Sequence, residues 1–147
     1  MDPASPSVED AIALAALAHR GQRYPSPESE PYIFHPLRIM LTCREPVDQM
    51  AAVLHDAVED TDLDLRDLVE AGYQTDVVTA VGSLTRRVSE PYEDYIERVA
   101  ENEVARRVKI ADLRENLANN QRLPEAPGNA ERIDRYEAAL ARLAGPS

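Results

Sequence analysis

Apolar residues recur at intervals of three and four positions along almost the whole chain, the period expected of helices with one buried face. Runs of β-branched residues, which would indicate strands, are few. The pattern therefore predicts an all-α protein in which short polar or proline-containing segments separate the helices.

Capping residues and prolines predict where these helices begin and end. A capping box formed by Ser7 and Asp10 opens the first helix, which Gly21 ends. Residues 24–31 contain three prolines and are expected to form a loop. Further helices are expected from His35-Pro36, from Pro46 through His55, from Asp62 or Asp64 to Gly72, over 76–84, from Pro91, over 103–119, and, after a loop at 123–129, from Asn129 as N-cap to Gly145.

Length and composition predict one soluble domain covering residues 1–147, with flexible ends at 1–6 and 145–147. A hydrophobic content of 44% in 147 residues is enough to build a single core. The chain has one cysteine and no basic segment followed by an apolar one at its N-terminus, so a disulfide framework and a targeting signal are not expected. We expect a cytoplasmic protein without membrane association.

The net charge of -11 limits the kinds of ligand that the protein can bind. Such a surface repels a phosphate backbone and argues against nonspecific binding of nucleic acids. A small anionic ligand requires cations that converge locally, and we expect them at Arg23 and Lys109, with Arg20 or Arg114 as further candidates. Lys109 is the only lysine in the chain, which suggests that a compact point charge is needed there.

A short segment behind an apolar run carries many ionisable groups. The run Met50–Leu54 is followed by His55, Asp56, Glu59 and Asp60. Positions three and four apart share one face of a helix, so these groups point toward one small volume. Buried carboxylates cost several kcal/mol each unless they are paired or bind a metal, so a purely structural role does not account for this segment.

Two polar residues elsewhere interrupt the apolar pattern in a similar way. Asp112 follows Val104 and Val108 at helical spacing, which places a carboxylate on the apolar face of its helix. His35 follows three large apolar or aromatic residues in the segment YIFHPL. Each has a structural alternative, because His35 could be a hydrogen-bonded core histidine and Asp112 could form an internal salt bridge with Lys109.

Taken together, the histidines and aspartates form a mixed set of nitrogen and oxygen donors. By themselves, His55 and Asp56 could be a polar pair at a helix end. With His35 and Asp112 they would bring two imidazoles and two carboxylates from separate helices, a set suited to Mn²⁺, Fe²⁺ or Zn²⁺. His19, at the end of the first helix, is either a hydrogen-bonded structural residue or part of a pocket wall.

The order of these residues resembles the H...HD...D signature of the HD superfamily of metal-dependent phosphohydrolases. Longer segments resemble more closely the hydrolase domain of the RelA/SpoT alarmone enzymes, and especially the stand-alone small alarmone hydrolases. These segments are AHRGQ at 18–22, PYIFHPLRI at 31–39, LHDAVEDT at 54–61 and VKIADLRENL at 108–117.

The resemblance implies a single helical bundle of the HD type and a metal-dependent reaction. The metal, usually Mn²⁺, would be held by His35, His55, Asp56 and Asp112. The residues that would activate or position the attacking water are Glu59 and Asp60, one turn beyond the ligands. The implied reaction is hydrolysis of the 3′-pyrophosphate of guanosine tetra- or pentaphosphate to give GDP or GTP and pyrophosphate.

The resemblance also implies contacts with a purine nucleotide polyphosphate at Arg23, Tyr24, Lys109 and Asn116. Tyr24 and Pro25 stand where family members carry a basic pair, and an aromatic face stacks on any purine, so guanine and adenine both remain open. Two alternatives are an HD phosphohydrolase acting on another nucleotide and a non-catalytic nucleotide-binding module. The oligomeric state is left open.

Overall fold

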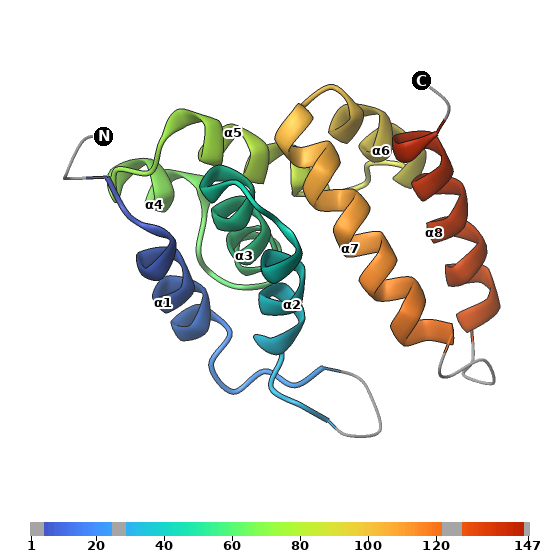
Figure 1. Ribbon diagram of the computed structural model, residues 1–147, viewed down its shortest axis with the longest axis horizontal. Coiled ribbons are helices and arrows are strands. Elements are labelled where there is room, and N and C mark those ends of the chain that lie inside the picture. The colour runs from blue at the N-terminus through green and yellow to red at the C-terminus, as the bar shows by residue number, and fades with distance from the viewer. Residues whose placement is uncertain (1–4, 25–28, 122–127, 146–147) are drawn as a thin grey trace.

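The structure is a computed structural model that describes residues 5–24, 29–121 and 128–145. Helices dominate this part of the chain, and its β-structure is an isolated antiparallel bridge between Arg23 and Pro31, so the all-α prediction is confirmed. The helices are α1 (Val8–Ala18), α2 (Phe34–Thr42), α3 (Pro46–Asp60), α4 (Leu65–Glu70), α5 (Thr75–Leu84), α6 (Tyr92–Ala100), α7 (Glu103–Gln121) and α8 (Asn129–Ala144) (Figure 1).

Helix α3 is the central element of the bundle. It contacts α1, α2, α5 and α7, and Figure 1 shows it behind α2, between α1 and α7. Its segment Met50–Ala57 is buried, because the apolar run of the sequence continues without interruption into His55 and Asp56. The helix that forms the core therefore also carries polar groups into it.

Local signals in the sequence account for most helix ends. Both bonds of the capping box are present between Ser7 and Asp10, and Asp64 forms a second box with Asp67 at the start of α4. Pro46 occupies the first turn of α3, where its missing N–H leaves no hydrogen bond unmade.

The predicted N-cap of the last helix is wrong by one residue. Asn129 is the first helical residue of α8, and the cap is Gly128, whose φ of 72° lies in the left-handed region. Glycine adopts this conformation without a steric penalty, which explains why the chain turns into the helix there. Most of the predicted flexible ends and of the loop at 123–129 lie outside the described residues.

The relative position of α3 and α7 matters because both carry predicted site residues. Arg107 of α7 donates to both carboxylate oxygens of Asp48 in α3, over 2.7 and 3.0 Å. Buried Val108 and Leu113 pack in the same hydrophobic core as the apolar residues of α3. Within the described ranges, no helix is long and apolar enough to cross a membrane.

Replacement of a core residue distant from the predicted donors should measure how strongly the bundle depends on packing. Leu84→Ala should lower the free energy of unfolding by about 3 kcal/mol, because Leu84 is fully buried and the change leaves a cavity. Val88→Ala, at a residue that is 96% exposed, is the matched control and should change it by less than about 0.5 kcal/mol. Urea denaturation monitored by circular dichroism gives both values, and equal midpoints would contradict the assignment of Leu84 to the core.

Candidate active site

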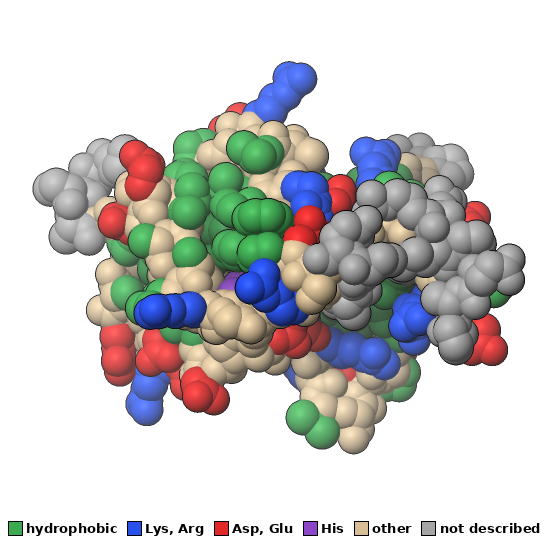
Figure 2. Space-filling model, turned by 90° about the horizontal axis from the view of Figure 1, so that it is seen from below, with side chains coloured by type: hydrophobic (Ala, Val, Ile, Leu, Met, Phe, Trp, Pro, Cys, Tyr) green, Lys and Arg blue, Asp and Glu red, His purple; other side chains and the backbone are tan. Residues whose placement is uncertain are grey.

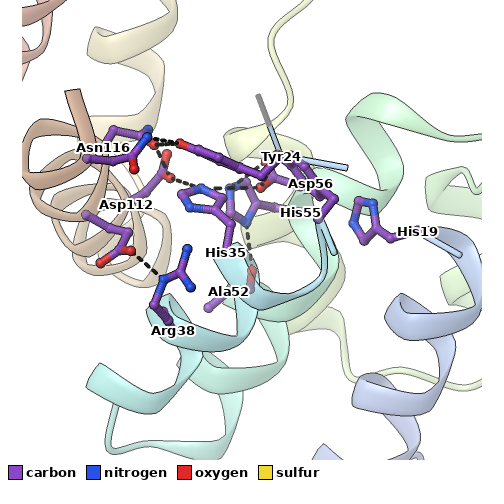
Figure 3. Close-up of polar contacts among 12 residues, drawn as sticks. His19, Tyr24, His35, Arg38, Ala52, His55, Asp56, Asp112 and Asn116 are labelled. Atoms are coloured by element: carbon purple, nitrogen blue, oxygen red, sulfur yellow. Dashed lines mark hydrogen bonds and ion pairs between the residues drawn. The ribbon is translucent and has the colours of Figure 1, made fainter. Parts of the chain in front are cut away.

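The structure brings together the four residues that the sequence predicts as metal ligands. His35 lies near the start of α2, His55 and Asp56 lie on α3, and Asp112 lies on α7. The Nε2 atom of His35 is 3.2 Å from Asp112 Oδ1 and 3.8 Å from Asp56 Oδ2. His55 Nε2 lies 3.2 Å from Asp56 Oδ1, so the donor atoms face one another across three helices (Figure 3).

The hydrogen bonds of His55 define which of its ring nitrogens carries the proton. Its Nδ1 lies 2.9 Å from the carbonyl oxygen of Ala52, which can only accept, so Nδ1 must donate. In the neutral ring Nε2 then presents a lone pair to a carboxylate oxygen of Asp56, and two acceptors face each other. A cation between them removes this conflict, and a backbone partner on the second ring nitrogen is the usual arrangement for a metal-bound histidine.

The donor atoms contact one another directly in this arrangement. Across the described ranges, no group of three or more His, Cys, Asp or Glu side chains has the geometry of a complete metal site. The chemistry of the donors nevertheless fits a divalent ion, because two imidazoles and two carboxylates converge and His55 Nε2 faces a carboxylate oxygen of Asp56. Their role as ligands stays a prediction.

Asp112 is the most heavily paired carboxylate of the cluster. Lys109 Nζ lies 3.0 Å from its Oδ2, while His35 Nε2 and the Asn116 amide lie 3.2 and 3.3 Å from its Oδ1. Burial alone would raise the pKa of Asp112, but the Lys109 ammonium and the His35 hydrogen bond hold it well below its usual range. Burial would lower the pKa of Lys109, and the Asp112 charge raises it well above its usual value. The two residues therefore form a buried ion pair.

This ion pair matches the structural alternative considered for Lys109. Its side chain is buried, and its ammonium lies 5.3 Å from the centre of the Tyr95 ring, a favourable cation–π distance. Contact between Lys109 and a phosphate oxygen stays a prediction.

Glu59 and Asp60 lie in the last turn of α3, next to the donor cluster but in contact with solvent. Partial burial, followed by the negative charge of Asp56, raises the pKa of both carboxyl groups. The two side chains are thus close to the cluster while water can still reach them, as the predicted role in activating water requires.

Tyr24 and Asn116 lie together over the cluster. The Tyr24 hydroxyl donates to Asn116 Oδ1 at 3.4 Å and accepts from the Asn119 amide at 3.2 Å. Its ring centroid lies 5.2 Å from that of His35 and 5.8 Å from that of Tyr32. Burial and the Asp112 charge raise the pKa of Tyr24 to about 12, so its hydroxyl remains protonated and able to donate.

The predicted arginines do not join this group. Arg23 and Arg20 are exposed, and Arg114 lines a groove between α2 and α7 together with Arg38 and Arg107. In the part of the chain that is described, no bond links Arg20, Arg23 or Arg114 to the cluster. Figure 2 shows basic side chains (blue) around a small visible patch of histidine (purple), which agrees with the deep burial of the histidines.

Sequence reasoning assigned no role to three residues that bond to the site. The Tyr32 hydroxyl donates to Asp56 Oδ2 at 3.1 Å, Asn119 binds the Tyr24 hydroxyl, and the Gln22 amide donates to the backbone carbonyl of Asp60 at 3.4 Å. Asn119 lies seven residues after Asp112, so helical periodicity could have indicated it. Tyr32 and Gln22 are in segments that resemble the family, but nothing in their spacing indicates which atoms they bind.

Comparison with known proteins identifies relatives over most of the chain, although no family model matches it. The guanosine-3′,5′-bis(diphosphate) 3′-pyrophosphohydrolases MESH1 of Danio rerio and Homo sapiens are each 33% identical over 138 residues, covering 86% of this chain and 76% of those proteins. A guanosine-3′,5′-bis(diphosphate) 3′-pyrophosphohydrolase of Vibrio cholerae is 32% identical over 105 residues, covering 69% of this chain and 14% of that protein.

A solved structure supports the same relationship. It is described as a metazoan ortholog of SpoT that hydrolyzes ppGpp and plays a role in starvation responses. It matches with a TM-score of 0.77 and 27% identity, covering 94% of this chain and 86% of that chain. The resemblance predicted from the motifs is confirmed.

Replacement of Lys109 should distinguish a structural ion pair from a phosphate contact. Lys109→Met should lower the free energy of unfolding of the metal-free protein by about 3 kcal/mol, because Asp112 stays buried without its main cationic partner. Arg66→Met removes an exposed cation from the Arg66–Glu70 pair and should cost about 0.5 kcal/mol at most. Both are measured by urea denaturation in the presence of a chelator.

The opposite result would assign Lys109 to the substrate. A Lys109→Met protein that unfolds at the wild-type urea concentration, but whose KM for a polyphosphorylated nucleotide rises at least about tenfold, would show that the ammonium binds phosphate.

Proposed function

We propose that this protein hydrolyses the 3′-pyrophosphate of guanosine tetra- or pentaphosphate. The chain belongs to the family of guanosine-3′,5′-bis(diphosphate) 3′-pyrophosphohydrolases. The products are GDP or GTP and pyrophosphate. We also propose that the protein is cytoplasmic and removes the alarmone of the stringent response.

The observation that carries the mechanism is the convergence of two imidazoles and two carboxylates from three helices. His35, His55, Asp56 and Asp112 would hold a divalent ion, and the family resemblance favours Mn²⁺. The contact between His55 Nε2 and an Asp56 oxygen supports this proposal, because a metal ion would satisfy both acceptors. When bound, the ion would polarise the phosphoryl group and make a water molecule more acidic.

Glu59 and Asp60 would take the proton of the attacking water. Their place one turn beyond Asp56, at the solvent-exposed end of α3, supports this role. A new bond then forms between the water oxygen and the phosphorus attached to the ribose 3′-oxygen, and the bond between that phosphorus and the 3′-oxygen breaks. The carboxylate accepts one proton of the water and returns it to the 3′-oxygen, which leaves as the hydroxyl group of the nucleotide.

Tyr24 and Asn116 would contact the nucleoside and Arg23 the phosphates, whereas Lys109 would act through its ion pair with Asp112. The half-buried Tyr24 ring offers an aromatic face beside the site. It stacks on Tyr32 and lies close to His35. Such a face stacks on guanine and adenine alike. Hydrolysis of an adenine polyphosphate is therefore the second candidate, and a direct assay separates the two.

The activity should be visible as release of pyrophosphate. Purified protein with Mn²⁺ should convert guanosine tetraphosphate to GDP and pyrophosphate, detected by ion-exchange chromatography and ³¹P NMR. A chelator should abolish turnover, and added Mn²⁺ should restore it. His55→Ala should lose stoichiometric Mn²⁺, whereas Glu70→Ala on the exposed face of α4 should keep both metal and activity.

Two results would contradict these assignments. Turnover of the adenine polyphosphate alone would support the second candidate, and stoichiometric Mn²⁺ retained by His55→Ala would remove His55 from the ligand set.

Glu59→Gln should separate water activation from metal binding. We expect unchanged Mn²⁺ affinity with kcat reduced roughly 10²- to 10⁴-fold, because the amide cannot take a proton from water. Glu70→Gln is the matched control at an exposed glutamate and should retain wild-type kcat. Loss of Mn²⁺ from Glu59→Gln would instead show that Glu59 is a ligand.

A further inference from the structure

His19 is a buried histidine next to the site with no part in the mechanism given above. Its side chain lies at the end of α1 and is only 2% exposed. The ring packs against Tyr32, with centroids 4.9 Å apart, and the Tyr32 hydroxyl binds Asp56. In Figure 3, His19 approaches the site from the α1 side, opposite Asn116 and Asp112.

The neighbours of His19 define its tautomer. The amide nitrogen of Gln22 donates to the backbone carbonyl of Asp60, which directs the amide oxygen of Gln22 toward His19. That oxygen lies 2.8 Å from His19 Nδ1 and can only accept, so Nδ1 carries the proton. The other nitrogen, Nε2, therefore presents a lone pair.

This lone pair has no donor among the residues of ranges 5–24, 29–121 and 128–145. A buried acceptor without a donor is unfavourable, and such atoms are commonly explained by a bound water or ligand. Through Gln22 the His19 ring is held next to the last turn of α3, whose Glu59 and Asp60 supply carboxylate acceptors.

We propose that His19 is a further residue of the hydrolytic site, whose Nε2 accepts a hydrogen bond from the attacking water. This inference rests on the proposed hydrolase activity. A water molecule has two hydrogens, and if Asp60 or Glu59 accepts one while His19 accepts the other, its lone pairs point away from both groups and toward the phosphorus. In this step the proton of the water moves to the carboxylate, and His19 only accepts a hydrogen bond.

Gln22 is a positioning residue in this arrangement. It fixes the His19 ring through Nδ1 and, through the Asp60 carbonyl, ties that ring to the last turn of α3. The two groups that would hold the water are thereby kept at a constant separation.

Asparagine and glutamine substitutions can test the two ring nitrogens separately. The amide of Asn reaches the position of Nδ1, whereas the amide of Gln reaches the position of Nε2. His19→Asn should therefore keep the contact with Gln22 and lose the acceptor for water. His19→Gln should keep an acceptor at the Nε2 position and lose the contact with Gln22.

The expected result is a loss of kcat in His19→Asn with other properties retained. Its melting temperature, its Mn²⁺ affinity by titration and its KM for guanosine tetraphosphate should stay close to wild type, while kcat falls about 100-fold. His19→Gln should recover most of that loss. Gln22→Met provides an independent variant, in which kcat should fall about tenfold at unchanged Mn²⁺ affinity because the ring is no longer fixed.

Other outcomes would overturn the proposal in distinguishable ways. Wild-type kcat in His19→Asn or in Gln22→Met would show that the pair serves only the fold. Loss of Mn²⁺ from His19→Asn would make His19 a metal ligand. Wild-type protein that releases no pyrophosphate would overturn both this inference and the proposed function, whereas an active wild type with an unaffected His19→Asn would overturn this inference alone.

Discussion

The structure depends on the burial of acceptor groups at the meeting point of three helices. Asp56 and Asp112 are almost fully removed from water, and both are surrounded by imidazole nitrogens, not by several cations. A carboxylate in such a place is tolerable only when positive charge or hydrogen-bond donors surround it. Lys109 supplies that charge to Asp112, whereas the donor to Asp56 among the described residues is the neutral Tyr32 hydroxyl. The bundle therefore holds its helices together around acceptor groups whose negative charge is only partly balanced by Lys109.

Helix α3 carries both this buried cluster and the exposed groups that are proposed to activate water. Its buried turns form the core and carry His55 and Asp56, and its last turn brings Glu59 and Asp60 to solvent. The transition occurs within one turn, so the proposed ligands and the proposed water-activating groups are held by the same rigid element. Gln22 fixes the end of this element by bonding the Asp60 carbonyl, a long-range contact that a frayed helix end would not maintain.

The sequence predicted the features that follow from local rules. A capping box and a proline placed the starts of α1 and α3, and α4 begins after Asp64, one of its two predicted caps, because the residues that satisfy a helix end lie within a few positions of it. The predicted donors were found because each interrupts an apolar face. The bond from Tyr32 to Asp56 and the bond from Gln22 to Asp60 could not be predicted, since each joins positions far apart in sequence and depends on side-chain packing. The tautomer of His19 depends on the orientation of the Gln22 amide and therefore on its bond to Asp60. The left-handed Gly128 moved the last cap by one residue.

The charge of the cluster also constrains the order of binding. Asp56, Asp112, Glu59 and Asp60 outnumber the Lys109 ammonium, so the site without a metal ion is strongly negative and would repel a nucleotide polyphosphate. A divalent ion reduces this charge but does not reverse it, and the whole chain carries a further net negative charge. Metal binding should therefore precede substrate binding, and the remaining repulsion must be overcome by cations outside the cluster. Arg23 stands beside Tyr24 and is exposed, which leaves its guanidinium free of the buried network and accessible to a phosphate group.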